Sequence, residues 1–299
     1  MTCISRRQAV IAIAVTITPG TTRSAQAQAP IPKPAIRPAT STAGSLPPIP
    51  PLTISPAIAA KVGRQVWHNE SGGSIDGLTA WNDAEDFPSL GIGHWIWFKA
   101  GGHPLFEESF PQLVDFIRNT GAKPPPWLDK RPVPPCPWLN KAEFYRKFNE
   151  PQLADLRRFL AATIPQQAQF LLARTEAAIP RMLATLPDAA DKRRLLENLN
   201  RIVRSAPDLY PLIDYVNFKG EGVSEKEMSF DATTGRKEGW GTKHLLLEMK
   251  PTPEGLPTLA EFSRAAKYVL DRRIRNHPSS QRWRIGWHKR CDTYARPLA

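Results

Sequence analysis

The segment WNDAEDFPSLGIGHWIW, residues 81–97, gathers side chains suited to acid–base chemistry on a substrate with flat apolar faces. Its chemically capable residues are Asp83, Glu85, Ser89 and His94, and its indoles are Trp81, Trp95 and Trp97. A further carboxylate, Glu70, precedes the segment. Glycosidic cleavage generally uses two carboxylates, one as the acid and the other as the base or nucleophile. The tryptophans would supply faces on which sugar rings pack, or they would belong to the core.

A single amphipathic helix is expected to present Glu70. Ser55-Pro56 is typical of an N-cap followed by proline at the first helical position, and Ile58, Val62 and Val66 follow at four-residue spacing. The pattern predicts a helix over 56–69 that the run Ser71-Gly72-Gly73 ends. A carboxylate at this end faces the negative pole of the helix dipole, which disfavours its charged form, as a general acid requires. The alternative is an exposed helix end without a function.

The rest of the ordered chain is predicted to be an α+β, predominantly helical domain: one helix, a small β region, then a helical body. Residues 74–97 carry glycine, proline and aromatic residues without a helical period, which predicts turns and short strands. Proline-rich residues 124–139 predict a loop. Helices are predicted at 141–149, 151–163, 165–186, 187–205, 207–218 and 257–276.

The block after Glu70 resembles the active-site region of the phage-type lysozymes, glycoside hydrolase family 24, in the lysozyme-like superfamily. That family has a glutamate at the end of its first helix, an aromatic-x-Asp, five residues, and then T-I-G-I-G-H. This chain has Trp81-Asn82-Asp83, five residues, and Ser89-Leu90-Gly91-Ile92-Gly93-His94. Residues 212–222 resemble the helix ending in F-N-x-G that lines the far wall of the family's cleft, and 269–276 resemble its closing L-x-x-R-R motif.

The resemblance implies a lysozyme-like fold and cleavage of the β-1,4 bond between the amino sugars of peptidoglycan. Glu70 would be the general acid, and Asp83 or Glu85 the second carboxylate; the longer interval between Glu70 and Asp83 here leaves that choice open. Ser89 would hold a water. The implied substrate contacts are Trp81, His94, Trp95, Trp97, Tyr215 and Asn217. No metal or cofactor is expected. Hydrolysis and transglycosylation, in which the glycan's own 6-hydroxyl attacks, both remain open.

Export is predicted from the N-terminus. Residues 1–27 combine a basic start with Arg6-Arg7, an apolar run over 9–17 and a small-residue site at Ala25-Gln26-Ala27, which is typical of a signal peptide, of the twin-arginine type. The apolar run is too short to span a membrane. Residues 28–56 hold nine prolines and predict a linker, so the domain would occupy 57–299. Periplasmic or secreted localisation follows, and Cys136 and Cys291 could pair or stay free.

The chain is basic, with a net charge of +12, and the charge is uneven. Between Arg264 and Arg290 lie nine Lys or Arg residues and a single acid, Asp271. Such a patch favours an anionic polymer through long-range attraction, or is simply a solvated helix face. Because no nucleic-acid-binding motif accompanies it, nucleic acid is not the expected partner. The second candidate function is a non-catalytic protein that binds cell-wall glycan. Nothing in the sequence indicates the oligomeric state.

Overall fold

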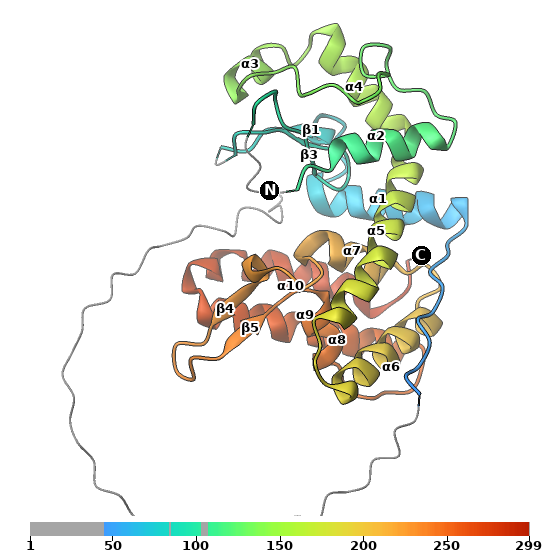
Figure 1. Cartoon of the computed structure of the whole chain (residues 1–299), viewed down its shortest axis with the longest axis vertical. Coiled ribbons are helices and arrows are strands. Elements are labelled where there is room, and N and C mark those ends of the chain that lie inside the picture. Colours follow the sequence, from blue (N-terminus) through green and yellow to red (C-terminus); the bar gives the residue numbers. More distant parts are fainter. Residues whose placement is uncertain (1–44, 84, 103–106, 299) are drawn as a thin grey trace, which may run out of the picture.

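The computed structural model describes residues 45–83, 85–102 and 107–298 and shows a predominantly helical chain with small antiparallel sheets (Figure 1). This is the predicted α+β class. The α-helices are α1 (Pro56–Ser71), α2 (Phe110–Asn119), α3 (Lys141–Arg146), α4 (Pro151–Ala162), α5 (Ile164–Ala184), α6 (Ala189–Ser205), α7 (Tyr210–Lys219), α8 (Thr242–Glu248), α9 (Leu256–Asn276) and α10 (Arg284–Asp292).

The predicted β region is confirmed as a three-stranded antiparallel sheet. Its strands are β1 (Thr79–Ala80), β2 (Ser89–Leu90) and β3 (Trp95–Ile96), in the order β1-β2-β3. Leu90 pairs with both Thr79 and Trp95. A separate hairpin joins β4 (Met228–Phe230) to β5 (Lys237–Gly239). Because each strand has only two or three residues, the sheets depend on the helices packed around them.

Helix α1 forms for the reasons read from its sequence. The Ser55 hydroxyl accepts a hydrogen bond from the Ile58 N–H at 3.3 Å, and Pro56 opens the helix. Gly72 ends it with a left-handed φ of 65°, its N–H bonded to the His68 carbonyl. Val62 and Val66 are fully buried on one face. This face lies against α5, and Gly63 permits the approach, because a Cβ there would be 2.7 Å from Ile164 Cγ2.

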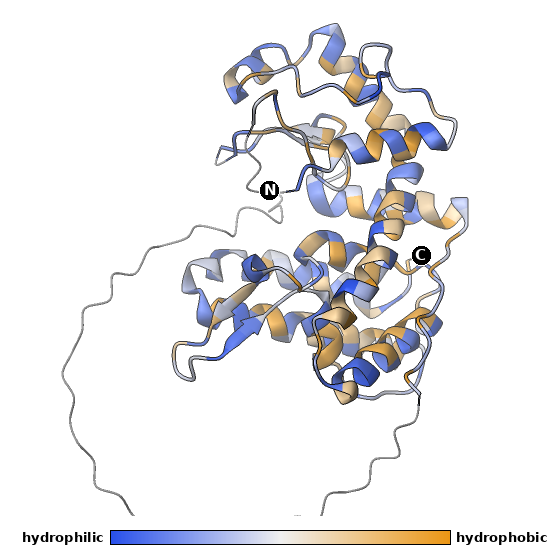
Figure 2. Cartoon of the chain, viewed as in Figure 1, coloured by the Kyte–Doolittle hydropathy of each residue, from blue (hydrophilic) through white to orange (hydrophobic). Residues whose placement is uncertain are grey.

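Helices α1 and α5 lie between two parts of the molecule (Figure 1). The three-stranded sheet and α2, α3 and α4 lie on one side, and α6 to α10 with the β4–β5 hairpin lie on the other. Apolar residues concentrate where these elements face each other (Figure 2). The long α5 contacts α1, α2 and α7, so it connects the β region to the helical body.

The predicted helices from residue 141 onward are confirmed, with ends that differ by a few residues; the first of them stops at Arg146. Three helices were not predicted: α2, α8 and α10. Helix α10 carries Arg284, Lys289 and Arg290, and its polar sequence has no continuous apolar stripe. Only Trp287, Arg290 and Cys291 of its residues are buried, so tertiary contacts rather than periodicity define it.

The predicted signal peptide, residues 1–27, and most of the predicted linker lie outside the described residues. The last part of that linker packs on the domain. Leu52 is buried, the Arg193 guanidinium donates to the Ser45 carbonyl at 3.1 Å, and the Asn200 amide donates to the Pro48 carbonyl at 2.9 Å. Residues 45–55 therefore run along α6 before α1 begins (Figure 1).

Cys136 and Cys291 are separate, buried thiols, which answers the question of pairing that the sequence leaves open. Burial raises the pKa of each to about 12, so both stay protonated at neutral pH. In the described part of the chain, no helix is both long and apolar enough to cross a membrane.

Replacing Gly63 with alanine tests the contact that seats α1. The new methyl would meet Ile164 Cγ2 at 2.7 Å and its carbonyl oxygen at 2.9 Å. We expect a loss of about 1–3 kcal/mol in the free energy of unfolding, because overpacking outweighs the better helix propensity of alanine. Gly286→Ala is the matched control, since nothing lies within 4 Å of a Cβ there. Denaturant unfolding should show no loss for the control; equal effects would contradict the close contact.

Candidate active site

Glu70 lies in the last turn of α1, and its side chain is almost fully buried, with 4% exposure. The structure therefore confirms the predicted position of Glu70 at the end of the first helix. Gly72 turns the chain away immediately afterwards, and the Trp67 indole N–H holds the following loop by donating to the Ser74 carbonyl at 3.0 Å. These contacts hold the backbone at the end of α1, which carries the Glu70 carboxylate, in one position.

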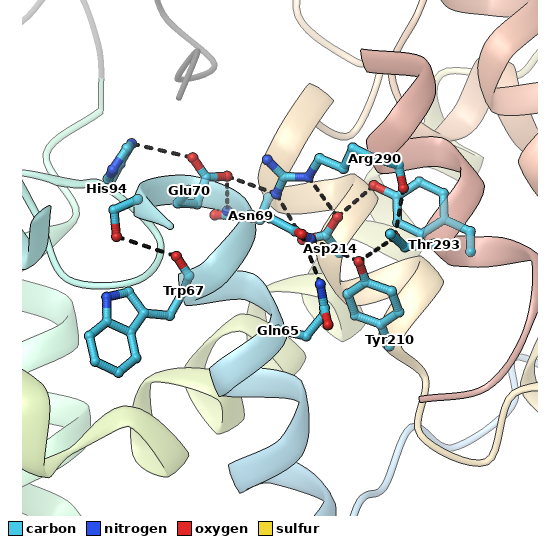
Figure 3. Close-up of polar contacts among 12 residues, drawn as sticks. Gln65, Trp67, Asn69, Glu70, His94, Tyr210, Asp214, Arg290 and Thr293 are labelled. Carbon is cyan, nitrogen blue, oxygen red and sulfur yellow. Dashed lines mark hydrogen bonds and ion pairs between the residues drawn. The ribbon is translucent and has the colours of Figure 1, made fainter. Parts of the chain in front are cut away.

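Three side chains from distant parts of the chain surround the Glu70 carboxylate, and Figure 3 labels two of them, His94 and Arg290. Arg290 Nη2 of α10 lies 2.8 Å from Oε1, and Asn217 of α7 donates to the same oxygen at 3.2 Å. His94 Nδ1 lies 3.4 Å from Oε2. Figure 3 shows Glu70 between His94 on one side and Arg290 on the other. Charged and polar contacts at both oxygens limit the orientations that the carboxylate can adopt.

Arg290 is held by a second, fully buried carboxylate, that of Asp214 in α7. Arg290 Nε donates to Oδ2 at 2.8 Å and Nη2 donates to Oδ1 at 2.7 Å, a bidentate pair. The Tyr294 hydroxyl donates to Oδ2 at 2.5 Å. Burial alone would lower the pKa of Arg290, but attraction by Asp214 and Glu70 outweighs it and raises that pKa. Arg290 therefore stays charged, and two carboxylates share its charge.

The same network returns to α1 through Asn69, the neighbour of Glu70. Its amide donates to the Tyr210 hydroxyl at 2.8 Å and to Asp214 Oδ1 at 3.2 Å. The Tyr210 hydroxyl also lies 2.6 Å from Thr293 Oγ1. Burial raises the pKa of Tyr210, so it remains a hydroxyl. Helix α1, α7 and the residues after α10 are thereby joined by polar contacts directly behind Glu70 (Figure 3).

A cavity of about 730 Å³ opens in front of Glu70. The β region lines it with Gly93–Ile96, α5 with Leu171, Arg174, Ala177 and Arg181, α7 with Val216–Lys219, and the segment 221–227 with several polar side chains. Trp240 and Arg273 complete the wall on the side of the helical body. The volume is in the range of cavities that bind small ligands. Glu70 is thus positioned where the β region meets the helical body.

The Gly-Ile-Gly-His turn brings His94 to this cavity. Gly91 has a left-handed φ of 65°, and the Ile92 N–H donates to Gln167 Oε1 of α5 at 2.9 Å. A Cβ at Gly93 would overlap the Trp95 ring. The close approach that these glycines allow is therefore to α5 and to an indole of the same turn. His94 itself has a φ of 51°, which is uncommon for a residue with a Cβ.

The predicted site residues separate into two groups. Those that line the cavity are Glu70, His94, Trp95 and Asn217. Those that do not line it are Asp83, Glu85, Ser89, Trp81, Trp97 and Tyr215. Trp81 and Trp97 are core residues, and Trp97 packs against Phe110 and Trp138. Tyr215 is fully buried, and its hydroxyl donates to the carbonyl of Trp240 at 2.8 Å, which supports a cavity residue from behind.

The two candidates for the second carboxylate make contacts away from the cavity lining. The Asp83 side chain is 97% exposed and pairs with Lys141 of α3. Glu85 is half-buried, and its Oε2 accepts hydrogen bonds from Asn82 at 3.0 Å and from Ser89 at 3.2 Å. Glu85 and Ser89 are therefore partners of each other. Among the predicted acids, Glu70 is the one at the cavity.

The site also contains residues that the sequence reading did not assign to it, namely Asp214, Lys219, Arg273 and Arg290. The sequence predicts only a basic segment around Arg290. Its partner Asp214 is 76 positions earlier in the chain, and no local pattern signals such a contact. One hint was present in the sequence: an aspartate lies within the apolar stretch LIDYVNF. Because a buried aspartate needs a charged partner, this position indicates a buried ion pair.

No group of three or more His, Cys, Asp or Glu side chains that could hold a metal ion occurs within residues 45–83, 85–102 and 107–298. Comparisons of the chain with protein-family models, with curated proteins and with solved structures find no match.

Removing the buried charge behind Glu70 should destabilise the fold strongly. Asp214→Ala leaves Arg290 buried with Glu70 as its remaining carboxylate, and we expect a loss of about 3–5 kcal/mol in the free energy of unfolding. Asp271→Ala is the control, since that partly exposed carboxylate also binds an arginine, Arg284, at 2.8 Å. It should cost about 1 kcal/mol or less. If Asp214→Ala and Asp271→Ala lost similar amounts of free energy of unfolding in denaturant, the buried ion pair of Asp214 would not stabilise the fold more than an exposed one.

Proposed function

We propose that this protein cleaves the β-1,4 bond between the amino sugars of peptidoglycan, with Glu70 as the proton donor. The observation that carries the proposal is the position of Glu70: a buried carboxylate at the end of α1, contacted by Arg290 and Asn217 and facing a cavity of about 730 Å³. The predicted signal peptide supports an exported protein that meets its substrate in the periplasm or outside the cell.

The arrangement of elements supports a lysozyme-like fold. A first helix ends in the candidate acid, a small antiparallel sheet follows, and the chain continues into a helical body. The cavity lies between that sheet and that body, with α5 along its wall. Resemblance to the phage-type lysozymes in Trp81-Asn82-Asp83 and in the turn ending at His94 agrees with this order. In that interpretation Asn217 of α7 belongs to the far wall of the substrate cleft.

Neither Asp83 nor Glu85 lines the cavity. The other acids that line it are Glu107, Glu221, which pairs with Arg181, and Glu227, which accepts hydrogen bonds from the Gly222 and Ser224 N–H groups. Because neither predicted second carboxylate is at the cavity, the arrangement favours the transglycosylase form of this chemistry. Protonated Glu70 gives its proton to the glycosidic oxygen as the bond to C1 breaks. The 6-hydroxyl of the same sugar then attacks C1 and returns its proton to the Glu70 carboxylate. The products are a 1,6-anhydro sugar and a new 4-hydroxyl end, and no water is consumed.

The surrounding residues would serve this reaction as positioning groups. Asn217 and Arg290 contact one carboxylate oxygen of Glu70, and His94 Nδ1 lies beside the other oxygen, Oε2. Because Arg290 is also bound by Asp214, its guanidinium is held in place beside the Glu70 carboxylate. Trp95 and Trp240, which line opposite sides of the cavity, would pack against sugar rings.

The test is digestion of purified sacculi, with mass spectrometry of the soluble fragments. Anhydro-ended fragments are expected from the wild type. Glu70→Gln should lower their release by about a hundredfold to ten-thousandfold, because the general acid is lost. Asp83→Asn and Glu85→Gln are matched controls that also replace a carboxylate by its amide, and they should release anhydro fragments at rates close to the wild type.

Other outcomes assign the chemistry differently. Reducing-end products that disappear in Asp83→Asn or Glu85→Gln would indicate hydrolysis with that residue as the second carboxylate. The runner-up function is a non-catalytic protein that binds cell-wall glycan. Wild-type protein that sediments with sacculi and releases nothing would favour it and would contradict cleavage.

A further inference from the structure

A buried lysine that the proposed reaction does not use lies in the same cavity as Glu70. Lys219 is the last residue of α7, and Gly220 turns the chain away with a φ of 91°. The residue is 4% exposed, yet it lines the cavity. Its neighbours Phe218 and Asn217 line the cavity as well, so the C-terminal turn of α7 presents one polar contact to Glu70 and one ammonium beside it.

The Lys219 ammonium is held by aromatic faces. Its Nζ lies 3.9 Å from the ring centre of Phe218 and 3.5 Å from the ring centre of Trp287. Within the described part of the chain, no hydrogen-bond acceptor for this ammonium is present. Aromatic rings stabilise a cation by their negative faces, but they do not replace the three acceptors that an ammonium can use.

The surroundings of Lys219 are unfavourable for a charge in the absence of a ligand. Burial first, and then the neighbouring Arg273 and Arg290, lower the pKa of Lys219 well below its ordinary value; Glu70 opposes this shift. Arg273 lies over the Trp240 ring at 3.8 Å and lines the same cavity, which adds positive potential. A buried cation without an acceptor destabilises a fold, so its presence here requires another reason.

We propose that Lys219 binds a carboxylate carried by the amino-sugar glycan that Glu70 cleaves. The inference rests on the proposed function and deepens it, because it names an acidic substituent as the feature recognised. An entering carboxylate would supply the acceptors that the ammonium lacks and would neutralise its charge. The muramic-acid lactyl group, or the peptide attached to it, can carry such a carboxylate. A chain of N-acetylglucosamine alone cannot.

Binding of small, uncleaved sugars tests the proposal directly. Isothermal titration would compare the disaccharide of N-acetylglucosamine and N-acetylmuramic acid, the same disaccharide with its stem peptide, and neutral chitobiose. Wild type should bind at least one acidic sugar about tenfold to a hundredfold more tightly than chitobiose. The disaccharide that binds more tightly identifies the lactyl group or the peptide as the source of the carboxylate.

Lys219→Met should bind all three sugars with similar affinity. Lys243→Met is the matched control, because Lys243 is also buried but donates to Thr185 Oγ1 at 2.9 Å and does not line the cavity. This control should keep the wild-type preference. A Lys219→Met variant that keeps the preference would overturn the proposal, as would wild-type protein that binds chitobiose equally well or binds no acidic sugar.

Stability distinguishes a binding lysine from a structural one. Because the folded state lowers the pKa of Lys219, the unfolded state binds more protons between the two pKa values, and wild-type stability rises with pH through that window. Lys219→Met should therefore be more stable than wild type near neutral pH, with an advantage that shrinks as the pH approaches about 10.5. If Lys219→Met were less stable than wild type at neutral pH, Lys219 would be a residue that stabilises the fold, and the proposal would be overturned.

The two proposals fail in different ways. If sacculi are cleaved but the acidic sugars are not preferred, recognition by Lys219 is wrong and the proposed function stands. If the folded protein neither cleaves sacculi nor binds any of the sugars, both are wrong.

Discussion

The arrangement of the site depends on one buried guanidinium, that of Arg290. Its bidentate pair with Asp214 fixes α10 against α7, and the contact of Nη2 with Glu70 at 2.8 Å connects both helices to the end of α1. A charge in this position needs its partners, because an unpaired buried charge costs several kcal/mol. The hydrogen bonds of Asn69 and Tyr294 to Asp214 complete the network. Three helices from distant parts of the chain therefore converge behind a single carboxylate.

This convergence holds the nearly buried carboxylate of Glu70 in the wall of the cavity. The network holds Glu70 from behind, while the cavity lies in front of it between the β region and the helical body. The Gly-Ile-Gly-His turn contributes the other wall, seated on α5 through Gln167. The cavity is lined by the carboxylate of Glu70, the indole of Trp95 and the amine of Lys219. These are the kinds of group that an acidic sugar would contact.

Several features of the fold and site could be predicted from the sequence. The cap at Ser55, the apolar spacing and the glycine after Ser71 predict α1 and its end, because capping and periodicity are local properties. The turn-rich composition after residue 73 predicts the short strands. Helix α2 could have been predicted, because its buried residues Phe110, Leu113, Val114 and Ile117 recur at helical spacing. Helices α8 and α10 have only seven and nine residues, and α10 is polar, so they depend on contacts made elsewhere.

The sequence by itself determined that Glu70 stands at a helix end and that an acid-rich, glycine-containing segment follows it. It did not determine which acids face a common cavity. Only the tertiary structure placed Asp83 in solvent beside Lys141 and paired Glu85 with Ser89, while it brought Asn217, from 147 positions away, to Glu70. The physical reason is that both features depend on the packing of the whole chain. Packing decides which way a side chain points in a short β region and which distant helices pair, and no local sequence pattern records either choice.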